Sequence, residues 1–276
     1  MRKTVTEIRS MKADGKRITV LTAYDASMAR LLGNCGVDVL LVGDSLGMVM
    51  LGYDSTVPVT MDEMLHHAKA VRRGAPDSFI VGDMPFGSYH TGTRDAVING
   101  QRFLKEAGCD AVKLEGGLAM CEIVRALIAA GVPVMAHIGL TPQTASQLGG
   151  YKVQGKGIEE ARRLLAEARG LEEAGAFGIV LECVPSKLAR VITTSLAMPT
   201  IGIGAGADCD GQVLVTHDML GMFEKFTPRF VKKYADLAPM MKTAVQQYVS
   251  EVQGGFYPGP EHGFAGESDY LELVSD

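Results

Sequence analysis

Short runs of apolar residues alternate with longer amphipathic segments along most of the chain. Four of these runs follow a glycine and end in an acidic residue or a histidine, and they span residues 36–44, 108–115, 131–137 and 175–182. The glycine suits the end of a helix, where a left-handed backbone conformation is common. Val-, Ile- and Leu-rich runs of this length are typical of parallel strands that are buried on both faces.

Further apolar runs complete the set of predicted strands, at residues 18–22, 79–83, 199–203 and 213–217. Helical patterns lie between the strands, at residues 27–32, 61–73, 93–107, 119–130, 158–174 and 186–196. Regular alternation of strands and helices predicts a parallel sheet. The connection between residues 206 and 213 is too short for a full helix, so the pattern departs there from a regular repeat.

About eight strand–helix units favour a single (β/α)8 TIM barrel over an open doubly wound sheet. No Gly-x-Gly-x-x-Gly follows the first strand, although a dinucleotide-binding sheet would need one. The length of 276 residues is also near the usual size of one such barrel. We therefore expect one domain over residues 1–276. A helix within about residues 1–17 would cap the lower end of the barrel, residues 228–253 would form a helical closing segment, and the tail from about 264 to 276 would be mobile.

Composition narrows the classes of function. The net charge of -5 argues against nucleic acid as the main partner, because phosphate binding needs clustered Lys and Arg. Five cysteines without a Cys-x-x-Cys pair indicate free thiols in a reducing compartment. No secretory signal is recognisable and the apolar runs are too short to span a membrane. We expect a cytoplasmic protein with no membrane partner.

Polar residues stand where the predicted strands end. In a barrel of this type the active site lies at the carboxyl ends of the strands. The residues at these positions are Asp44, Ser45, Asp83, Lys113, Glu115, His137, Glu182, His217 and Asp218. Buried carboxylates cost free energy unless they are paired or bound to a cation, so this set points to chemistry.

Asp44, Asp83 and Glu115 follow from three successive units and can converge on one point. A set of oxygen ligands suits a hard cation, most simply Mg²⁺, whereas zinc prefers thiolates and imidazoles. An isolated Asp after a strand is more often a helix N-cap than a ligand. Acids at four strand ends favour the functional interpretation.

Other candidate residues keep two interpretations. Lys113 lies two residues before Glu115, so both side chains point to the same side of their strand. An inward lysine suits anion binding, and the alternative is a structural ion pair. His137 can support the site or serve as a structural hydrogen-bonding residue. Residues 149–157 suit a mobile flap over the site or an ordinary surface loop.

The chain resembles the 3-methyl-2-oxobutanoate hydroxymethyltransferase family, also called the ketopantoate hydroxymethyltransferases, over about residues 3–263. The resemblance rests on many separate motifs in the right order: 41–48 (LVGDSLGM), 54–60 (DSTVPVT), 71–75 (VRRGA), 112–117 (VKLEGG), 137–143 (HIGLTPQ), 149–155 (GGYKVQG), 181–185 (LECVP) and 201–206 (IGIGAG). The acidic end after Phe264 is not part of the family pattern and receives no role.

The resemblance implies that 3-methyl-2-oxobutanoate takes a one-carbon unit from 5,10-methylenetetrahydrofolate to give 2-dehydropantoate, in pantothenate biosynthesis. It also implies a barrel of the phosphoenolpyruvate/pyruvate-domain type and a homo-oligomer, commonly a decamer. It implies one Mg²⁺ held by Asp44, Asp83 and Glu115. Substrate would bind at Asp44, Ser45, Asp83 and Lys113, and Glu182 would be the catalytic proton acceptor.

The chemistry of the residues agrees with this assignment. A 2-oxo acid can chelate Mg²⁺ through its carboxylate and keto oxygens, and the metal then stabilises the enolate. Glu182 stands on a different strand from the expected ligands and can act as the base. A rival enzyme class uses the same architecture, namely a C–C lyase or mutase of the isocitrate lyase and phosphoenolpyruvate mutase type, but the Lys-Lys-Cys-Gly-His stretch of the lyases is absent. A barrel that only binds a ligand is the non-catalytic alternative.

Overall fold

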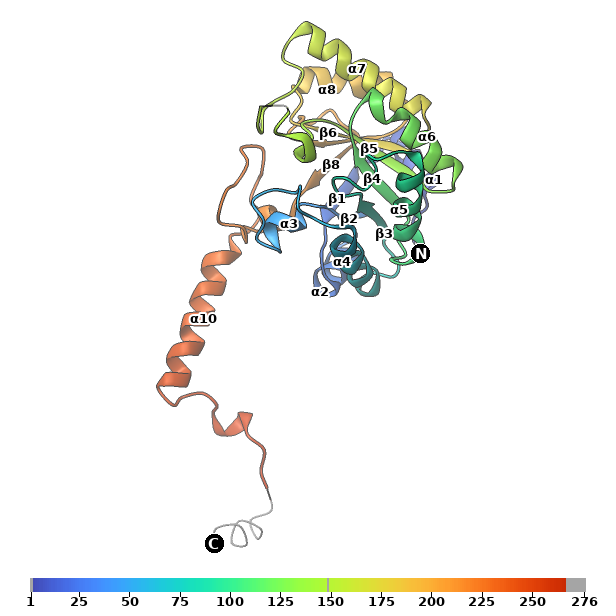
Figure 1. Cartoon of the computed structure of the whole chain (residues 1–276). Coiled ribbons are helices and arrows are strands. Elements are labelled where there is room, and N and C mark those ends of the chain that lie inside the picture. The colour runs from blue at the N-terminus through green and yellow to red at the C-terminus, as the bar shows by residue number, and fades with distance from the viewer. Residues whose placement is uncertain (1, 148, 267–276) are drawn as a thin grey trace.

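Eight parallel strands close into a barrel in the order of the sequence, which confirms the predicted fold class. The computed structural model describes residues 2–147 and 149–266 (Figure 1). The strands are β1 (Ile18–Thr22), β2 (Val39–Val42), β3 (Phe79–Asp83), β4 (Ala111–Glu115), β5 (Val134–Gly139), β6 (Gly178–Glu182), β7 (Thr200–Ile203) and β8 (Gly211–Leu214). Each strand pairs in parallel with its neighbours, and β8 pairs with β1 to complete the ring.

The helices that cover the strands begin and end within two residues of the predicted bounds. They are α2 (Ala26–Asn34), α4 (Met61–Gly74), α5 (Thr93–Lys105), α6 (Cys121–Ala129), α7 (Ile158–Glu173) and α8 (Ser186–Ser195). Local chemistry explains the starts: Thr60 and Glu63 form a capping box at the first turn of α4. Shorter turns of helix are α3 (Leu46–Val49), α9 (Thr216–Met219), η1 (Leu118–Met120), η2 (Pro142–Thr144) and η3 (Pro260–His262).

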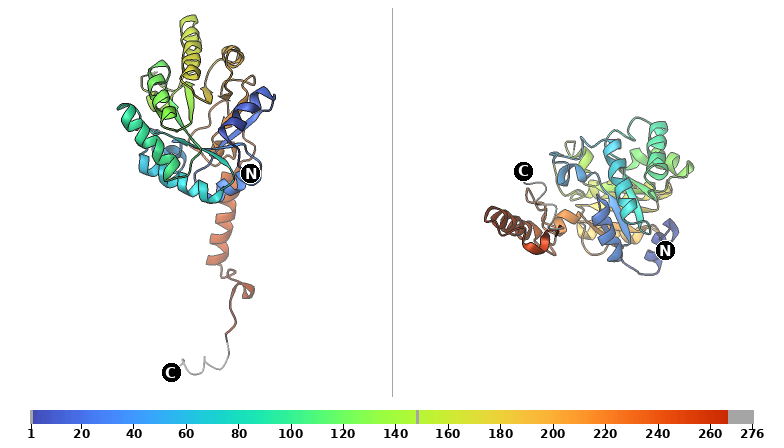
Figure 2. Two further views of the ribbon diagram at one scale, coloured as in Figure 1. Left: turned by 90° about the vertical axis from the view of Figure 1, so that its right-hand side faces the viewer. Right: turned by 90° about the horizontal axis from the view of Figure 1, so that it is seen from below.

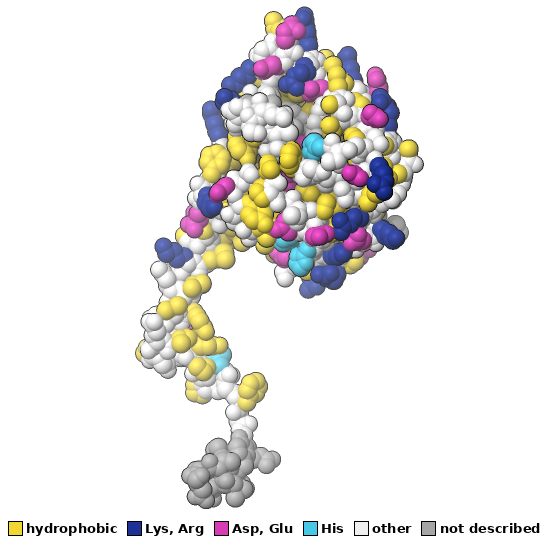
Figure 3. Space-filling view, viewed as in Figure 1, with side chains coloured by type: hydrophobic (Ala, Val, Ile, Leu, Met, Phe, Trp, Pro, Cys, Tyr) yellow, Lys and Arg dark blue, Asp and Glu magenta, His cyan; other side chains and the backbone are white. Residues whose placement is uncertain are grey.

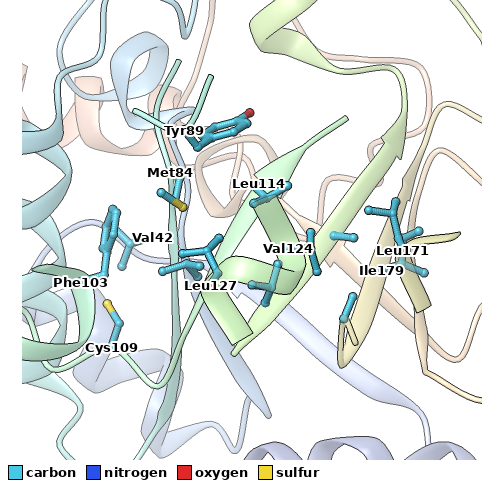
Figure 4. Close-up of a cluster of buried hydrophobic side chains, with 14 of the residues drawn as sticks. Val42, Met84, Tyr89, Phe103, Cys109, Leu114, Val124, Leu127, Leu171 and Ile179 are labelled. Atoms are coloured by element: carbon cyan, nitrogen blue, oxygen red, sulfur yellow. The ribbon is translucent and has the colours of Figure 1, made fainter. Parts of the chain in front are cut away.

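Two hydrophobic clusters hold the barrel together. One lies between the strands and the surrounding helices, where Phe103 and Leu127 pack near Val42 and Leu114 (Figure 4). The other fills the barrel interior with residues such as Val39 and Phe79. Helix α1 (Val5–Ala13) adds the buried Ile8 and Met11 to this interior cluster. The apolar interior leaves the polar side chains to the carboxyl ends of the strands.

The eighth strand differs from the prediction. β8 covers residues 211–214 rather than 213–217, because its register pairs Gly211 with Ile18 and Leu214 with Leu21 of β1. Thr216 then bonds Thr22 through its backbone N–H, and the chain turns into α9. His217 and Asp218 therefore lie in a short helix beyond the strand and not at the strand end.

One flank of the barrel has no covering helix among the residues that the structure describes. The outward residues Thr19 of β1 and Gln212 of β8 are exposed, whereas β2 to β4 are buried along their whole length. A groove of about 990 Å³ lies along this flank, between β1, β8 and the segment that follows β7. The connection between β7 and β8 has no helix, as the short spacing predicted.

The expected closing segment does not close the barrel of its own chain. Residues 228–236 are irregular, and α10 (Leu237–Gln253) projects away from the barrel with no buried residue (Figures 1 and 2). Apolar side chains lie exposed along the projecting helix (Figure 3). The prediction was wrong because amphipathicity identifies a helix with an apolar face but not the surface against which that face packs.

The helices and the cysteines bear on the predictions made from composition. No helix in residues 2–147 and 149–266 is both long enough and apolar enough to cross a membrane. All five cysteines are free. The prediction of a mobile tail falls mainly on residues 267–276, which lie outside the described residues.

Candidate active site

Three buried acids meet at the carboxyl end of the barrel. Asp44 follows β2, Asp83 ends β3 and Glu115 ends β4, and each is at most 4% exposed. The backbone N–H of Asp44 donates to Oδ2 of Asp83 at 3.3 Å. Successive parallel strands bring their ends to one edge, so acids that are distant in sequence become neighbours.

Lys113 lies among these acids. Its Nζ is 2.8 Å from Oδ1 of Asp83 and 3.9 Å from Oε1 of Glu115. Lys113 and Glu115 point to the same side of β4, as their spacing predicted. The surrounding carboxylates outweigh the effect of burial and raise the pKa of Lys113, so the ammonium stays charged.

His137 links two of the acids. Its Nδ1 is 3.4 Å from Oε1 of Glu115, and its Nε2 is 3.2 Å from Oε2 of Glu182. Burial and the charge of Lys113 lower the pKa of His137, but the two glutamates outweigh them and raise it to about 9. A cation bound to Glu115 would oppose part of this rise.

Glu182 ends β6, and its side chain is 15% exposed. Glu182 is therefore more accessible to solvent than Asp44, Asp83 or Glu115. The backbone around it is unusual: Cys183 has φ of 50°, and Gly139 of β5 has φ of 96°. A Cβ at Gly139 would collide with the carbonyl of Glu182, so only glycine lets β5 approach there.

Ser45 begins the turn that leads into α3. Its Oγ lies 2.9 Å from the hydroxyl of Tyr24, which is 1% exposed. Burial raises the pKa of Tyr24, so the phenol stays protonated. Sequence reasoning assigned no role to Tyr24, which lies between β1 and Asp25, the N-cap of α2.

Gln143 connects Asp44 and Glu115, and sequence reasoning gave it no role. Its Nε2 donates to Oδ2 of Asp44 at 2.9 Å, and its backbone N–H donates to Oε2 of Glu115 at 3.1 Å. Tyr89 donates to Oε1 of Gln143 at 2.6 Å. Gln143 ends the HIGLTPQ motif, but an amide in a turn carries no signal of the acids that it will meet.

The pKa values of the three acids shift in different directions. Burial, reinforced by the charges of Asp83 and Glu115, raises the pKa of Asp44 well above its usual value. Burial also raises the pKa of Asp83. Burial would raise the pKa of Glu115 as well, but the hydrogen bond from His137 and the charge of Lys113 lower it. A cation beside Asp44 and Asp83 would remove the cost of keeping both ionised.

The carboxylates of Asp44 and Asp83 fit Mg²⁺ as a partial set of protein ligands. Oδ1 of Asp83 is buried with no hydrogen bond of good geometry, although Lys113 is close. In the described part of the chain, no three His, Cys, Asp or Glu side chains form a ready metal cluster. Mg²⁺ usually keeps several waters and takes one or two protein carboxylates, so Asp44 and Asp83 fit this ion without a complete protein cage.

The acids open into a cavity of about 410 Å³. Asp44, Ser45, Asp83, Lys113, Glu115, His137 and Glu182 all line it. Tyr151 and Val153, from the segment predicted as a flap, lie at its edge and are more than 40% exposed. The predicted residues are therefore brought together, with acids at the base and apolar side chains toward the opening.

Of the two residues misplaced by the prediction of β8, Asp218 lines this cavity and His217 does not. His217 is buried beside the ring of Tyr24, with the ring centres 5.5 Å apart.

The sequence matches the family model described as ketopantoate hydroxymethyltransferase over residues 2–260. A 3-methyl-2-oxobutanoate hydroxymethyltransferase of Desulfotalea psychrophila is 64% identical, with 100% of this chain and 99% of the relative covered. The protein of the same name from Heliobacterium modesticaldum is 57% identical, with 98% of each chain covered.

Several solved structures with a similar fold are of proteins with low sequence identity to this chain. A phosphonopyruvate hydrolase, solved with oxalate and Mg²⁺, superposes with a TM-score of 0.62 at 12% identity, covering 98% of this chain and 95% of its own. A 2,3-dimethylmalate lyase of the phosphoenolpyruvate mutase/isocitrate lyase superfamily superposes with a TM-score of 0.58 at 16% identity, covering 99% and 94%. These likenesses concern the fold alone and agree with the closed eight-stranded barrel.

Proposed function

Since the chain belongs to the ketopantoate hydroxymethyltransferase family, we propose that it transfers a hydroxymethyl group from 5,10-methylenetetrahydrofolate to 3-methyl-2-oxobutanoate. The product is 2-dehydropantoate, on the route to pantothenate. The observation that carries the proposal is the position of Glu182, which faces the same cavity as the Lys113–Asp83 pair but lies on a strand apart from it. Glu182 as a base and Lys113 as an anion-binding group can then act on one small substrate in this cavity.

Asp44 and Asp83 would hold the Mg²⁺, with Glu115 as the third ligand of the proposed set. Bound there, the ion would supply Lewis-acid polarisation of the keto group of the 2-oxo acid. Support comes from the raised pKa of Asp44 and from the distantly related phosphonopyruvate hydrolase, whose structure contains oxalate and Mg²⁺.

The protein side chains have separate tasks in this scheme. Lys113 and Ser45 bind the carboxylate of the acid, because an ammonium and a hydroxyl both donate to oxygen. Glu182 accepts the proton from C3, and the positive charge of His137, whose Nε2 lies 3.2 Å from Oε2 of Glu182, attracts that carboxylate. C3 then bonds to the methylene carbon, and both bonds from that carbon to the folate nitrogens break. A water supplies the hydroxyl group, and tetrahydrofolate leaves with the proton taken from C3 and the second proton of the water.

We also propose that the enzyme works as a cytoplasmic homo-oligomer, with the decamer as the expected form. The exposed apolar face of α10 and the uncovered groove beside β1 and β8 support an exchange between copies. Helix α10 of one copy would cover the flank of another, because α10 leaves apolar side chains in water and the flank has a groove beside it that no helix fills.

Proton exchange tests the reaction without folate. The protein is incubated with 3-methyl-2-oxobutanoate and Mg²⁺ in D₂O, and the C3 proton is followed by NMR. Wild type should exchange it, and Glu182→Gln should lose about 10²- to 10⁴-fold in rate while still binding the acid. The matched control is Glu159→Gln, which removes the same charge from an exposed position on α7. Full exchange by Glu182→Gln would exclude Glu182 as the base.

The rival lyase or mutase makes a different prediction. It requires no exchange with 3-methyl-2-oxobutanoate and instead exchange or cleavage of another 2-oxo acid. The same NMR assay with a panel of 2-oxo acids separates the two activities.

A further inference from the structure

A buried carboxylate faces the cavity without a partner. Asp218 of α9 is 8% exposed and lines the cavity, and its carboxylate makes no hydrogen bond or ion pair with any described residue. Burial raises its pKa to about 6, against the opposing charge of Lys233, so it is ionised at pH 8. An unpaired buried charge costs free energy, and a position of this kind calls for a ligand that supplies donors.

Aromatic side chains continue the wall from Asp218. Phe223, Phe226 and Phe230 all line the cavity, and Phe226 is 66% exposed. The loop that carries them approaches the segment after α3, since Nζ of Lys225 is 3.8 Å from Oδ1 of Asp54. An exposed aromatic wall gains most from a flat, apolar ligand that covers it.

The cavity is larger than the small acid alone requires. Its volume of about 410 Å³ lies in the range of sites that enclose a drug-sized ligand. The charged groups at its base suffice for the 2-oxo acid, which leaves the apolar outer part for a second molecule. That molecule must deliver a carbon to the acid, so it must reach inward as well as cover the wall.

We propose that Asp218 and the adjacent phenylalanines bind the pterin ring of the folate, an inference that rests on the proposed function. The 2-amino group and the neighbouring ring N–H of a pterin are two parallel donors that match the two oxygens of a carboxylate. The flat ring then packs on the aromatic wall. Arg229, which also lines the cavity and has no ion pair with a described residue, is placed for the carboxylates of the glutamate tail.

Asp218 also lies close to the acid-binding end. Burial and the nearby charges of Asp218 and Asp44 together raise the pKa of Tyr24, whose hydroxyl is 2.9 Å from Oγ of Ser45. A pterin ring at Asp218 therefore places the carbon-bearing part of the folate beside the substrate that Ser45 and Lys113 hold.

Calorimetry with fragments of the folate tests the assignment. Tetrahydrofolate, 6-methyltetrahydropterin (the ring alone) and p-aminobenzoylglutamate (the tail alone) are titrated into wild type, Asp218→Asn and Asp208→Asn at pH 8. Asp208 is an exposed acid that does not line the cavity, so its variant controls for charge. Asp218→Asn should weaken tetrahydrofolate and the ring by about ten- to a hundredfold and leave the tail unchanged, since a hydrogen bond to a charged group is lost.

The exchange of the C3 proton in D₂O keeps the two hypotheses apart, because it needs no folate. If wild type shows no exchange, the proposed function fails whatever Asp218 does. If wild type exchanges but Asp218→Asn binds the pterin as tightly as wild type, the assignment of Asp218 is overturned. Weakened binding of 3-methyl-2-oxobutanoate with unchanged pterin binding would also overturn it and would place Asp218 in the acid subsite.

Discussion

Gln143 holds two acids that come from different strands. It donates to Asp44 through its side chain and to Glu115 through its backbone, and it accepts from Tyr89. Burial of the residue, at 3% exposed, keeps water from replacing these bonds. Groups of this kind orient ligands without touching the metal, and their loss commonly weakens metal binding.

Substitution of Gln143 by Met, which keeps the length but removes the amide, should weaken binding of Mn²⁺ by about ten- to a hundredfold. Electron paramagnetic resonance of free Mn²⁺ measures this directly, without substrate. Gln147→Met is the matched control, because Gln147 is exposed in the same loop. An unchanged Mn²⁺ affinity in a folded Gln143→Met protein would show that the amide plays no part in positioning the ligands.

At the scale of elements, α10 leaves an apolar face exposed, and the flank of β1 and β8 lacks a helix over it. Met241, Val245, Tyr248, Val249 and Val252 share one face of α10 and are each at least 43% exposed. An exposed apolar stripe of this size usually marks an interface. The helix pattern was predictable, but the direction in which α10 leaves the barrel was not.

Val245→Asp should therefore reduce the mass of the assembly in solution, because it introduces a charge into the proposed interface. Light scattering after size exclusion measures the mass. Thr243→Asp, on the opposite face of α10, should leave the mass unchanged. A monomeric wild type, or a Val245→Asp protein with wild-type mass, would contradict the exchange of α10 between copies.

At the scale of the whole molecule, the buried acids of the site lower the stability of the folded state when they are ionised. Asp44 and Asp83 are buried together, and burial raises the pKa of both. A cation that binds only the folded state removes this cost and stabilises the entire barrel by linkage.

Mg²⁺ at a hundredfold excess over its dissociation constant should stabilise the fold by about 2.7 kcal/mol. For a domain near this size, that raises the melting temperature by roughly 5–10 °C. Calorimetry with Mg²⁺ and with EDTA measures the shift, and Asp83→Asn should abolish most of it. Equal melting temperatures in Mg²⁺ and EDTA would argue against a metal site among these acids.

The sequence alone determined the barrel and identified most of the polar residues that line its cavity. Each strand–helix unit carries its own signal, because apolar runs and helix-ending glycines are local patterns. Parallel strands must end at one edge, so Asp44, Asp83, Glu115 and Glu182 could be grouped before any contact was known.

Only the tertiary structure decided the contacts between distant segments. Gln143 reaches Asp44 across 99 positions of sequence, and no local pattern records that approach. Asp218 moved from a predicted strand end to a short helix because β8 takes its register from β1. Helix α10 leaves its own barrel although its apolar stripe was predictable, because amphipathicity does not specify the surface against which that stripe packs.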